Sequence, residues 1–249
     1  MSSNLKIMWH QGQQFIPDVT TVTIPGEFRG RPVISTAKVN EDLLVDLCPT
    51  KAISASPFCI DLGKCTFCGE CAIQCPEKIS FTKDYKISSN ERSRLIIREG
   101  EDHPILINPE LVRQEIRRIF GGSLKLRQVS AGGDNSCEME LNATNNVNFD
   151  MSRFGIDFVA SPRHADGIVI TGPITVNMAE PLEKCYRAVP NPKIIILAGT
   201  DAISGGIFTD SPALNREFLK KNTIDLYVPG NPIHPLTFIN GVLSLLKKK

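Results

Sequence analysis

Four cysteines of the chain follow one another at a spacing that suits iron–sulfur chemistry. Residues 65–76 read CTFCGECAIQCP, with Cys65, Cys68 and Cys71 at intervals of three and Cys75 before a proline. Thiolates at this spacing let a tight loop wrap three irons of a 4Fe-4S cluster, and a small glycine within the loop eases the bend. The fourth cysteine of such a run binds the other cluster of a two-cluster fold. Zinc fits less well, because its sites are built from two separated ligand pairs.

A second, incomplete copy of the pattern ends at Cys48, in the stretch VDLCPTKAI. Its companion thiolates would stand ten, seven and four residues earlier, at positions that hold Lys38, Glu41 and Leu44. None of these side chains holds an iron–sulfur cluster. We therefore expect one 4Fe-4S cluster with four ligands: Cys48, Cys65, Cys68 and Cys71. Cys75 is then free; the alternative is that Cys75 closes the cluster and Cys48 is an idle core thiol.

Together these stretches resemble a bacterial-type ferredoxin over residues 31–90, and the resemblance implies an α+β domain that carries one electron at a time. Eight cysteines without a secretory signal indicate metal chemistry rather than disulfides. Cys59, in an expected strand, and Cys185, in an expected helix, are interpreted as core thiols.

The composition is that of an ordinary globular protein, with 249 residues, 41% hydrophobic and 22% charged, and a net charge of +1. This charge gives no reason to expect a nucleic-acid partner. No apolar run approaches the ~18 residues that a membrane helix needs. We expect a cytoplasmic protein without a membrane span of its own, peripheral to the inner membrane through partner subunits.

From residue 124 onward, short apolar runs alternate with helical stretches. Strands are expected within 124–129, 155–161, 166–172, 193–199 and 223–230, and helices within 175–189, 213–221 and 234–248. This alternation predicts an α/β fold with a flavodoxin-like open parallel sheet and helices on both faces. The expected division is an N-terminal extension (1–30), the ferredoxin-like domain (31–90), a helical linker (91–123) and the sheet domain (124–249).

Within the linker, NPELVRQEIRRIFGG predicts a helix with Asn108 as its N-cap, Pro109 at its first position and Gly121 at its end. We expect this helix to bridge or pack between the two domains.

Over residues 124–246 the sequence resembles the family of complex I's small, 20 kDa-type iron–sulfur subunit and the small subunits of nickel–iron hydrogenases. Three stretches carry the resemblance: RFGIDFVASPRHADGIVITGPIT (153–175), SGGIF (204–208) and IDLYVPG (224–230). Within the family, the chain is most similar to the branch of energy-converting hydrogenases and formate hydrogenlyase.

The resemblance implies a proximal 4Fe-4S cluster held against a large catalytic subunit. Its four ligand positions fall on Asp134, Cys137, Asp201 and Asn231, so only one thiol remains and the cluster is expected to be lost. Two alternatives stay open: a pocket filled by hydrogen bonds and water, or a site for another divalent ion, since carboxylate and amide oxygens suit harder metals. Glu138 is expected to cap its helix or to meet the partner subunit.

These expectations describe an electron-transfer accessory subunit of a membrane-associated hydrogenase, formate hydrogenlyase or complex I-like oxidoreductase, without a catalytic site of its own. Its partners would be a hydrogenase-large-subunit-like protein, membrane subunits, and a ferredoxin-type donor or acceptor. The alternative is a non-redox structural subunit of a complex I-like ion-translocating assembly. The resemblance also places a quinone near such subunits, but the residues specific to complex I are not recognisable here.

Overall fold

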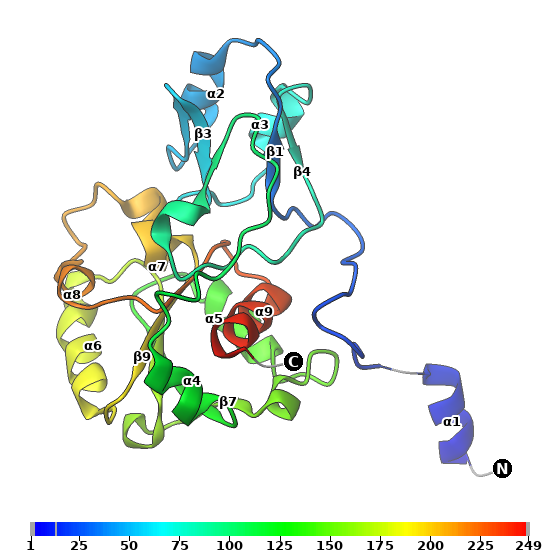
Figure 1. The fold of residues 1–249 in the computed structure, drawn as a ribbon, viewed down its shortest axis with the longest axis vertical. Coiled ribbons are helices and arrows are strands. Elements are labelled where there is room, and N and C mark those ends of the chain that lie inside the picture. The colour runs from blue at the N-terminus through cyan, green and yellow to red at the C-terminus, as the bar shows by residue number, and fades with distance from the viewer. Residues whose placement is uncertain (1–2, 13, 248–249) are drawn as a thin grey trace.

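The computed structural model describes residues 3–12 and 14–247. Figure 1 shows a helix near the N-terminus that stands away from the rest, an upper unit of short strands, and a lower unit built on a larger sheet. The outlying helix, α1 (Ser3–Gln11), contains no buried residue. None of the helices in the described residues combines the length and the apolar character needed to cross a membrane.

The larger sheet has five parallel strands in the order β10-β9-β8-β6-β7. They are β6 (Leu124–Ser130), β7 (Ile156–Phe158), β8 (Gly167–Thr171), β9 (Ile194–Ala198) and β10 (Leu226–Val228). In chain order the sheet reads 2-1-3-4-5, which is the flavodoxin-like order. The five predicted strands and the α/β class are therefore confirmed.

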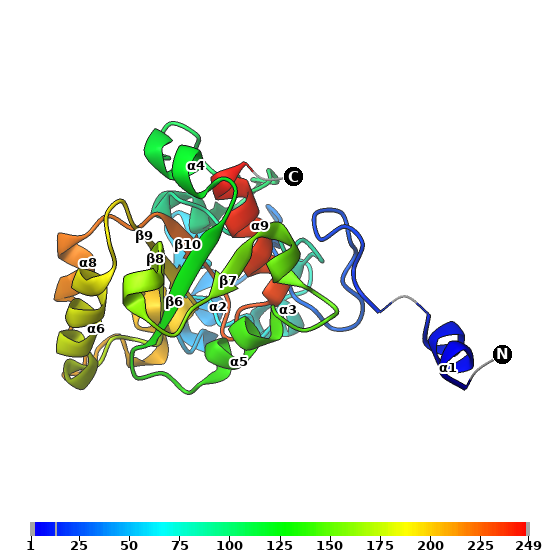
Figure 2. The same ribbon diagram turned by 90° about the horizontal axis from the view of Figure 1, so that it is seen from below.

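Helices cover both faces of this sheet, as predicted. Along β8, Ile168 and Ile170 belong to the core on one face, and Val169 belongs to the core on the other. The first face is covered by α6 (Val176–Ala188) and α8 (Glu217–Lys221). The opposite face is covered by α4 (Gln114–Phe120), α5 (Ser136–Ala143) and α9 (Pro235–Leu246), as Figure 2 shows. Because both faces are covered, every residue of β8 and β9 is buried.

The upper unit consists of two consecutive strand–helix–strand repeats. The first is β1 (Pro32–Ile34), α2 (Glu41–Leu47) and β2 (Ile53–Ala55); the second is β3 (Phe58–Asp61), α3 (Glu70–Gln74) and β4 (Ile79–Phe81). The outer strands β1 and β4 pair antiparallel, and so do the inner strands β2 and β3. The repeats are thus related by a pseudo-two-fold, in which Cys48 ends α2 as Cys75 ends α3.

The strand β5 (Ile96–Arg98) follows a 3-10 helix at Arg92–Leu95. It pairs antiparallel with β3 and so completes a three-stranded sheet with β2 and β3. The remaining helical segments are α7 (Thr200–Ser204) and 3-10 turns at Met151–Phe154, Pro162–His164 and Gly206–Phe208. The helix predicted within 213–221 is limited to α8, because Asn215 N–H bonds Ile174 O before the helix begins.

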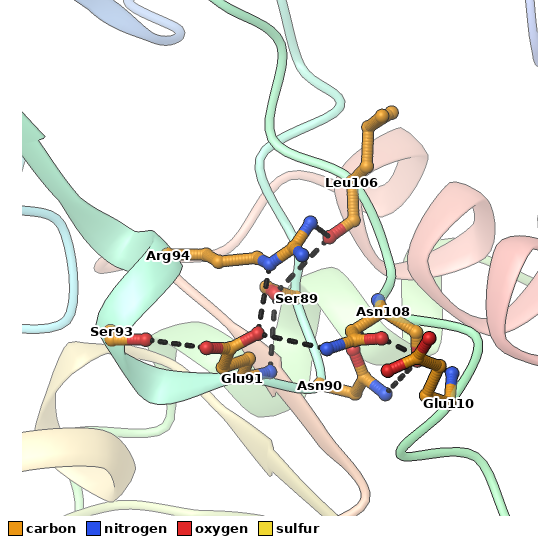
Figure 3. Close-up of polar contacts among 8 residues, drawn as sticks. All are labelled: Ser89, Asn90, Glu91, Ser93, Arg94, Leu106, Asn108 and Glu110. Atoms are coloured by element: carbon orange, nitrogen blue, oxygen red, sulfur yellow. Dashed lines mark hydrogen bonds and ion pairs between the residues drawn. The ribbon is translucent and has the colours of Figure 1, made fainter.

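The predicted start of the linker helix at Asn108 is wrong, because α4 begins at Gln114. Figure 3 shows the cause: Asn108 belongs to a polar network with Asn90 and Glu91. Its backbone N–H bonds Asn90 Oδ1 at 2.7 Å, and its own Oδ1 accepts from Glu110 N–H at 3.1 Å, which forms a turn. The helix ends at Gly121 as predicted, but it packs on α9 rather than between the units.

Backbone and side-chain contacts fasten the upper unit to the lower one. Ser89 forms an antiparallel bridge with Tyr227 of the edge strand β10. One residue earlier, Ser88 Oγ donates to Thr237 O at 3.0 Å. Gly241 of α9 packs so closely that a Cβ atom there would lie 2.7 Å from Ser88 Oγ. These contacts fix the position of the segment that leaves β4.

Candidate functional site

One cavity of the upper unit is lined by four thiols: Cys48, Cys65, Cys68 and Cys71. The first comes from the end of α2, the next two from the loop between β3 and α3, and the last from α3. Apolar side chains such as Ile53, Ile60 and Phe81 complete the wall. Cys75, itself within the described part of the chain, does not line this cavity. The pseudo-two-fold explains this pairing, because it turns the cysteine that ends each helix toward the other repeat.

The loop around these thiols has the geometry that the spacing predicts. Gly69 adopts φ +85°, a left-handed conformation that suits glycine, and its position is the N-cap of α3. Two backbone N–H groups point at sulfur: Ala52 N lies 3.2 Å from Cys48 Sγ, and Phe67 N lies 3.3 Å from Cys65 Sγ. Such N–H donors stabilise thiolate sulfur and tune a bound cluster.

The electrostatics of the cavity favour a cationic centre between the sulfurs. Burial raises the pKa of Cys65 to about 12 and that of Cys71 to about 11. Neighbouring thiols of the same set contribute part of both rises. Four thiolates this close together would repel one another. A bound metal centre would offset this repulsion and favour the deprotonated form of each thiol.

The chemistry of the four thiols suits an iron–sulfur cluster. Within residues 3–12 and 14–247, no three His, Cys, Asp or Glu side chains are arranged to hold one metal ion. A cubane spreads its four ligands around a larger body, and four sulfurs lining one cavity are the donors it requires. The cavity reaches from the interior to the protein surface, because Cys65 is buried and Cys68 is exposed.

A buried ion pair joins α2 of the first repeat to the segment just before β4 of the second. Lys78 is fully buried, and its Nζ donates to Glu99 Oε1 at 2.6 Å, Glu41 Oε1 at 3.2 Å and Ala37 O at 3.0 Å. The ammonium also lies 4.7 Å from the centre of the Phe58 ring. Burial works to lower the pKa of Lys78, but the hydrogen bonds and charges of the two glutamates outweigh it and raise the value.

Glu41 is one of the three positions where the sequence lacks a thiolate. Leu44, another of them, is fully buried, whereas Lys38 is exposed. Cys75 is buried at the end of α3, where its N–H bonds Cys71 O. The interpretation of Cys59 as a core thiol is wrong in part, because Phe58 and Ile60 take the inward face of β3 and Cys59 is half-exposed.

Three of the four family ligand positions, Cys137, Asp201 and Asn231, contact one another in the segments that follow strands β6, β9 and β10. Cys137 Sγ lies 3.7 Å from Asn231 Oδ1, and Asn231 Nδ2 lies 3.4 Å from Asp201 Oδ1. The fourth, Asp134, instead bonds within its own segment, with its Oδ1 accepting from Ser136 N–H at 3.0 Å. Hydrogen bonds therefore join Cys137, Asn231 and Asp201 to one another. The loss of the cluster stays a prediction.

Close packing of the glycine-rich loops narrows the space between these groups. A Cβ atom on Gly199 would lie 2.6 Å from Cys137 Sγ, and one on Gly206 would lie 1.9 Å from Asp201 Oδ1. Burial, together with smaller contributions from nearby acids, raises the pKa of Cys137 to about 12 and that of Asp201 to about 6. The hydrogen bonds from Ser136, by contrast, lower the pKa of Asp134.

Glu138 does neither of the things expected of it. Its carboxylate is buried and accepts a 2.7 Å hydrogen bond from Thr171 Oγ1 at the end of β8. It therefore fastens α5 to the sheet rather than capping the helix or reaching a partner.

The two sites are joined by one buried hydrogen bond. Thr200 Oγ1 donates to the carbonyl of Cys65 at 2.7 Å, and Asp201 is the next residue along α7. Sequence reasoning missed this link and missed Lys78, because both depend on contacts between segments far apart in the chain. The sequence holds one signal for Lys78. Glu41 is an acidic residue at a position where the cysteine pattern would have a thiolate, and a carboxylate there could have suggested a cationic partner.

The similarity to a known protein family lies in the lower unit. Residues 135–245 match the family described as "NADH ubiquinone oxidoreductase, 20 Kd subunit". The chain is 34% identical over 134 residues to the probable membrane-bound hydrogenase subunit mbhJ of Pyrococcus furiosus. That alignment covers 54% of this chain and 80% of the relative.

Two further relatives are matched over about half of this chain. Formate hydrogenlyase subunit 7 of Escherichia coli is 41% identical over 125 residues, which is 49% of each chain. An NADH-quinone oxidoreductase subunit of Heliobacterium modesticaldum is 42% identical over 113 residues, covering 45% of this chain and 65% of the relative.

Proposed function

Because the chain belongs to the family of the 20 kDa subunit of NADH–ubiquinone oxidoreductase, we propose that it is an electron-transfer accessory subunit. Its parent complex would be a membrane-associated hydrogenase, a formate hydrogenlyase-like enzyme or a complex I-like oxidoreductase. The observation that carries the proposal is the single cavity lined by the thiols of Cys48, Cys65, Cys68 and Cys71.

The upper unit is proposed to be a ferredoxin-like domain that holds one 4Fe-4S cluster. Two pseudo-symmetric strand–helix–strand repeats and the cysteine spacing both support this assignment. A cluster bound there would take up and release one electron at a time. The chain's own contribution would be the four thiolates and the N–H donors of Ala52 and Phe67. Cys75 would remain free.

The lower unit is proposed to supply shape and an interface rather than a second cluster. Only Cys137 offers a thiol among the four family positions, and Asn231 already hydrogen-bonds with it and with Asp201. Exposed apolar side chains surround these loops: Met139, Val176, Ile207 and Phe208. Apolar surface at this edge of the sheet suits a large partner, which we propose to be a hydrogenase-large-subunit-like protein. Through it and the membrane subunits, the chain would lie at the cytoplasmic side of the inner membrane.

Iron and sulfide analysis of protein purified without oxygen tests this function. We expect about four irons and four sulfides per chain, the stoichiometry of one 4Fe-4S cluster, and a paramagnetic signal after dithionite reduction. Cys48→Ala should remove the signal, whereas Cys75→Ala should retain it. The opposite behaviour of the two variants would reassign the fourth ligand. About eight irons would mean that the lower site also holds a cluster.

A non-redox structural role is the second candidate, and the lower site favours it. Electron transfer from the upper unit to a large subunit would lack an intermediate cluster there, since three of the four family positions carry no thiol. Turnover of the parent complex separates the two functions. If the complex assembled with Cys48→Ala retains full turnover, the cluster is architectural and the chain is a structural subunit.

A further inference from the structure

A short segment before β1, residues 26–31, crosses the loop that carries the cluster cysteines. Its backbone is fixed at several points. Gly30 N–H bonds Thr82 O at 2.8 Å, and Lys83 Nζ donates to Phe28 O at 2.9 Å. A Cβ atom on Gly30 would lie 2.0 Å from Asp84 O, so only glycine permits this approach. The segment therefore holds its side chains in defined places.

The side chain of Arg29 lies directly on the cysteine loop. A Cβ atom on Gly69 would lie 2.5 Å from Arg29 Nε and 3.1 Å from Arg29 Cδ. The guanidinium also approaches Phe67 O, at 3.5 Å from NH1. Phe67 and Gly69 are the two neighbours of Cys68, the exposed thiol of the set. The positive charge is thus fixed beside the exposed edge of the site.

Arg29 is half-buried between two surface hollows, and Glu27 is the acidic residue that lines both. A charge that is partly shielded from water acts more strongly on its neighbours than a fully solvated one. Addition of one electron makes an iron–sulfur centre more negative by one unit, and no proton is required. A nearby cation stabilises the reduced form more than the oxidised form.

We propose that Arg29 sets the reduction potential of the cluster that Cys48, Cys65, Cys68 and Cys71 hold. This inference rests on the proposed function. Arg29 is a positioning and tuning residue: it provides no ligand, and it acts through the charge that it places beside Cys68.

A redox titration followed by electron paramagnetic resonance tests the inference, with dithionite as the electron donor. Arg29→Met should lower the potential, so that the ratio of reduced to oxidised cluster at a fixed potential falls about tenfold, equivalent to about 59 mV. Arg29→Lys keeps the charge and should recover most of the wild-type potential. The shift should diminish at high salt, because ions screen partly exposed charges.

Lys38→Met is the matched control, since it removes one positive charge from an exposed position in the same unit. It should leave the potential close to that of the wild type. A wild-type potential in Arg29→Met, with a normal signal, would overturn the inference and leave the proposed function intact. Equal shifts in Arg29→Met and Arg29→Lys would overturn it too, because charge would then not be the cause. A wild-type protein without any cluster signal would instead overturn the proposed function.

Discussion

The carboxyl group of Asp201 occupies a buried position where the family pattern places a cysteine. Burial, with a smaller contribution from the charge of Asp134, raises its pKa from an ordinary value of about 3.9 to about 6, and the charge of Arg216 offsets only part of the rise. Between about pH 4 and pH 6 the folded protein holds a proton that the unfolded chain has released. The free energy of unfolding therefore falls as the pH rises through this window, and the loss is complete above it.

Asp201→Asn should remove this pH dependence. The amide keeps an oxygen for the hydrogen bond from Asn231 but carries no charge. We expect the variant to be more stable than the wild type by about 1–3 kcal/mol at pH 7.5, and by less at pH 5.5. The midpoints of urea unfolding at the two pH values measure the difference.

Asp134→Asn is the control of opposite sign, because hydrogen bonds from Ser136 lower the pKa of Asp134 and favour its charged form. This variant should be less stable than the wild type at pH 7.5. Equal gains for Asp201→Asn at both pH values would contradict the assigned cause.

Among the elements, the two strand–helix–strand repeats have kept their pairing while their contents have diverged. The shared cavity takes three thiols from the second repeat and Cys48 from the first. Lys78, which lies just before β4, pairs with Glu41 of α2 and with Glu99 at the end of β5. A buried ammonium is stable only when it is fully paired, and the carboxylates of Glu41 and Glu99 provide that pairing. The ion pair thus ties together α2, the segment before β4 and the end of β5.

Lys78→Met should destabilise the protein by about 2–4 kcal/mol, because it leaves two carboxylates beside an apolar core. The loss lies below the largest values for buried pairs, since both glutamate side chains are about one-third exposed and water can solvate them in part. Urea unfolding measures the effect. In the control Lys51→Met, the lost pair with Asp210 is 79% and 84% exposed, and the change should stay below about 1 kcal/mol. Similar losses in the two variants would show that Lys78 has no special role.

The elements that follow from local patterns were the ones that the sequence predicted well. Buried runs such as 193–199 became strands because their neighbours on both faces are also apolar. The thiols of Cys65, Cys68 and Cys71 share a cavity with Cys48, and their role as cluster ligands stays a prediction. The start of α4 could not be predicted, because the side chain of Asn90, distant in sequence, captures Asn108 in a turn. The position of Arg29 could not be predicted for the same reason, because no local pattern places its side chain against Gly69.

At the scale of the whole molecule, direct contacts join the two sites and the units that carry them. The buried hydrogen bond from Thr200 to Cys65 O joins the cysteine loop to the start of α7, beside Asp201. The Ser89 bridge to β10 fastens the upper unit at a second point. A partner that binds around Asp201 would therefore contact α7, which is hydrogen-bonded directly to the cysteine loop.

Thr200→Val tests this coupling with little change of shape. The variant leaves the buried carbonyl of Cys65 without its donor, which costs about 1–3 kcal/mol locally. We expect amide hydrogen exchange in residues 66–69 to become at least about tenfold faster, while exchange in β8 stays unchanged. Thr200→Ser keeps the hydroxyl and should restore slow exchange. If Thr200→Val exchanges like the wild type, the cysteine loop is held by the upper unit alone, and contacts at the lower site cannot reach it by this route.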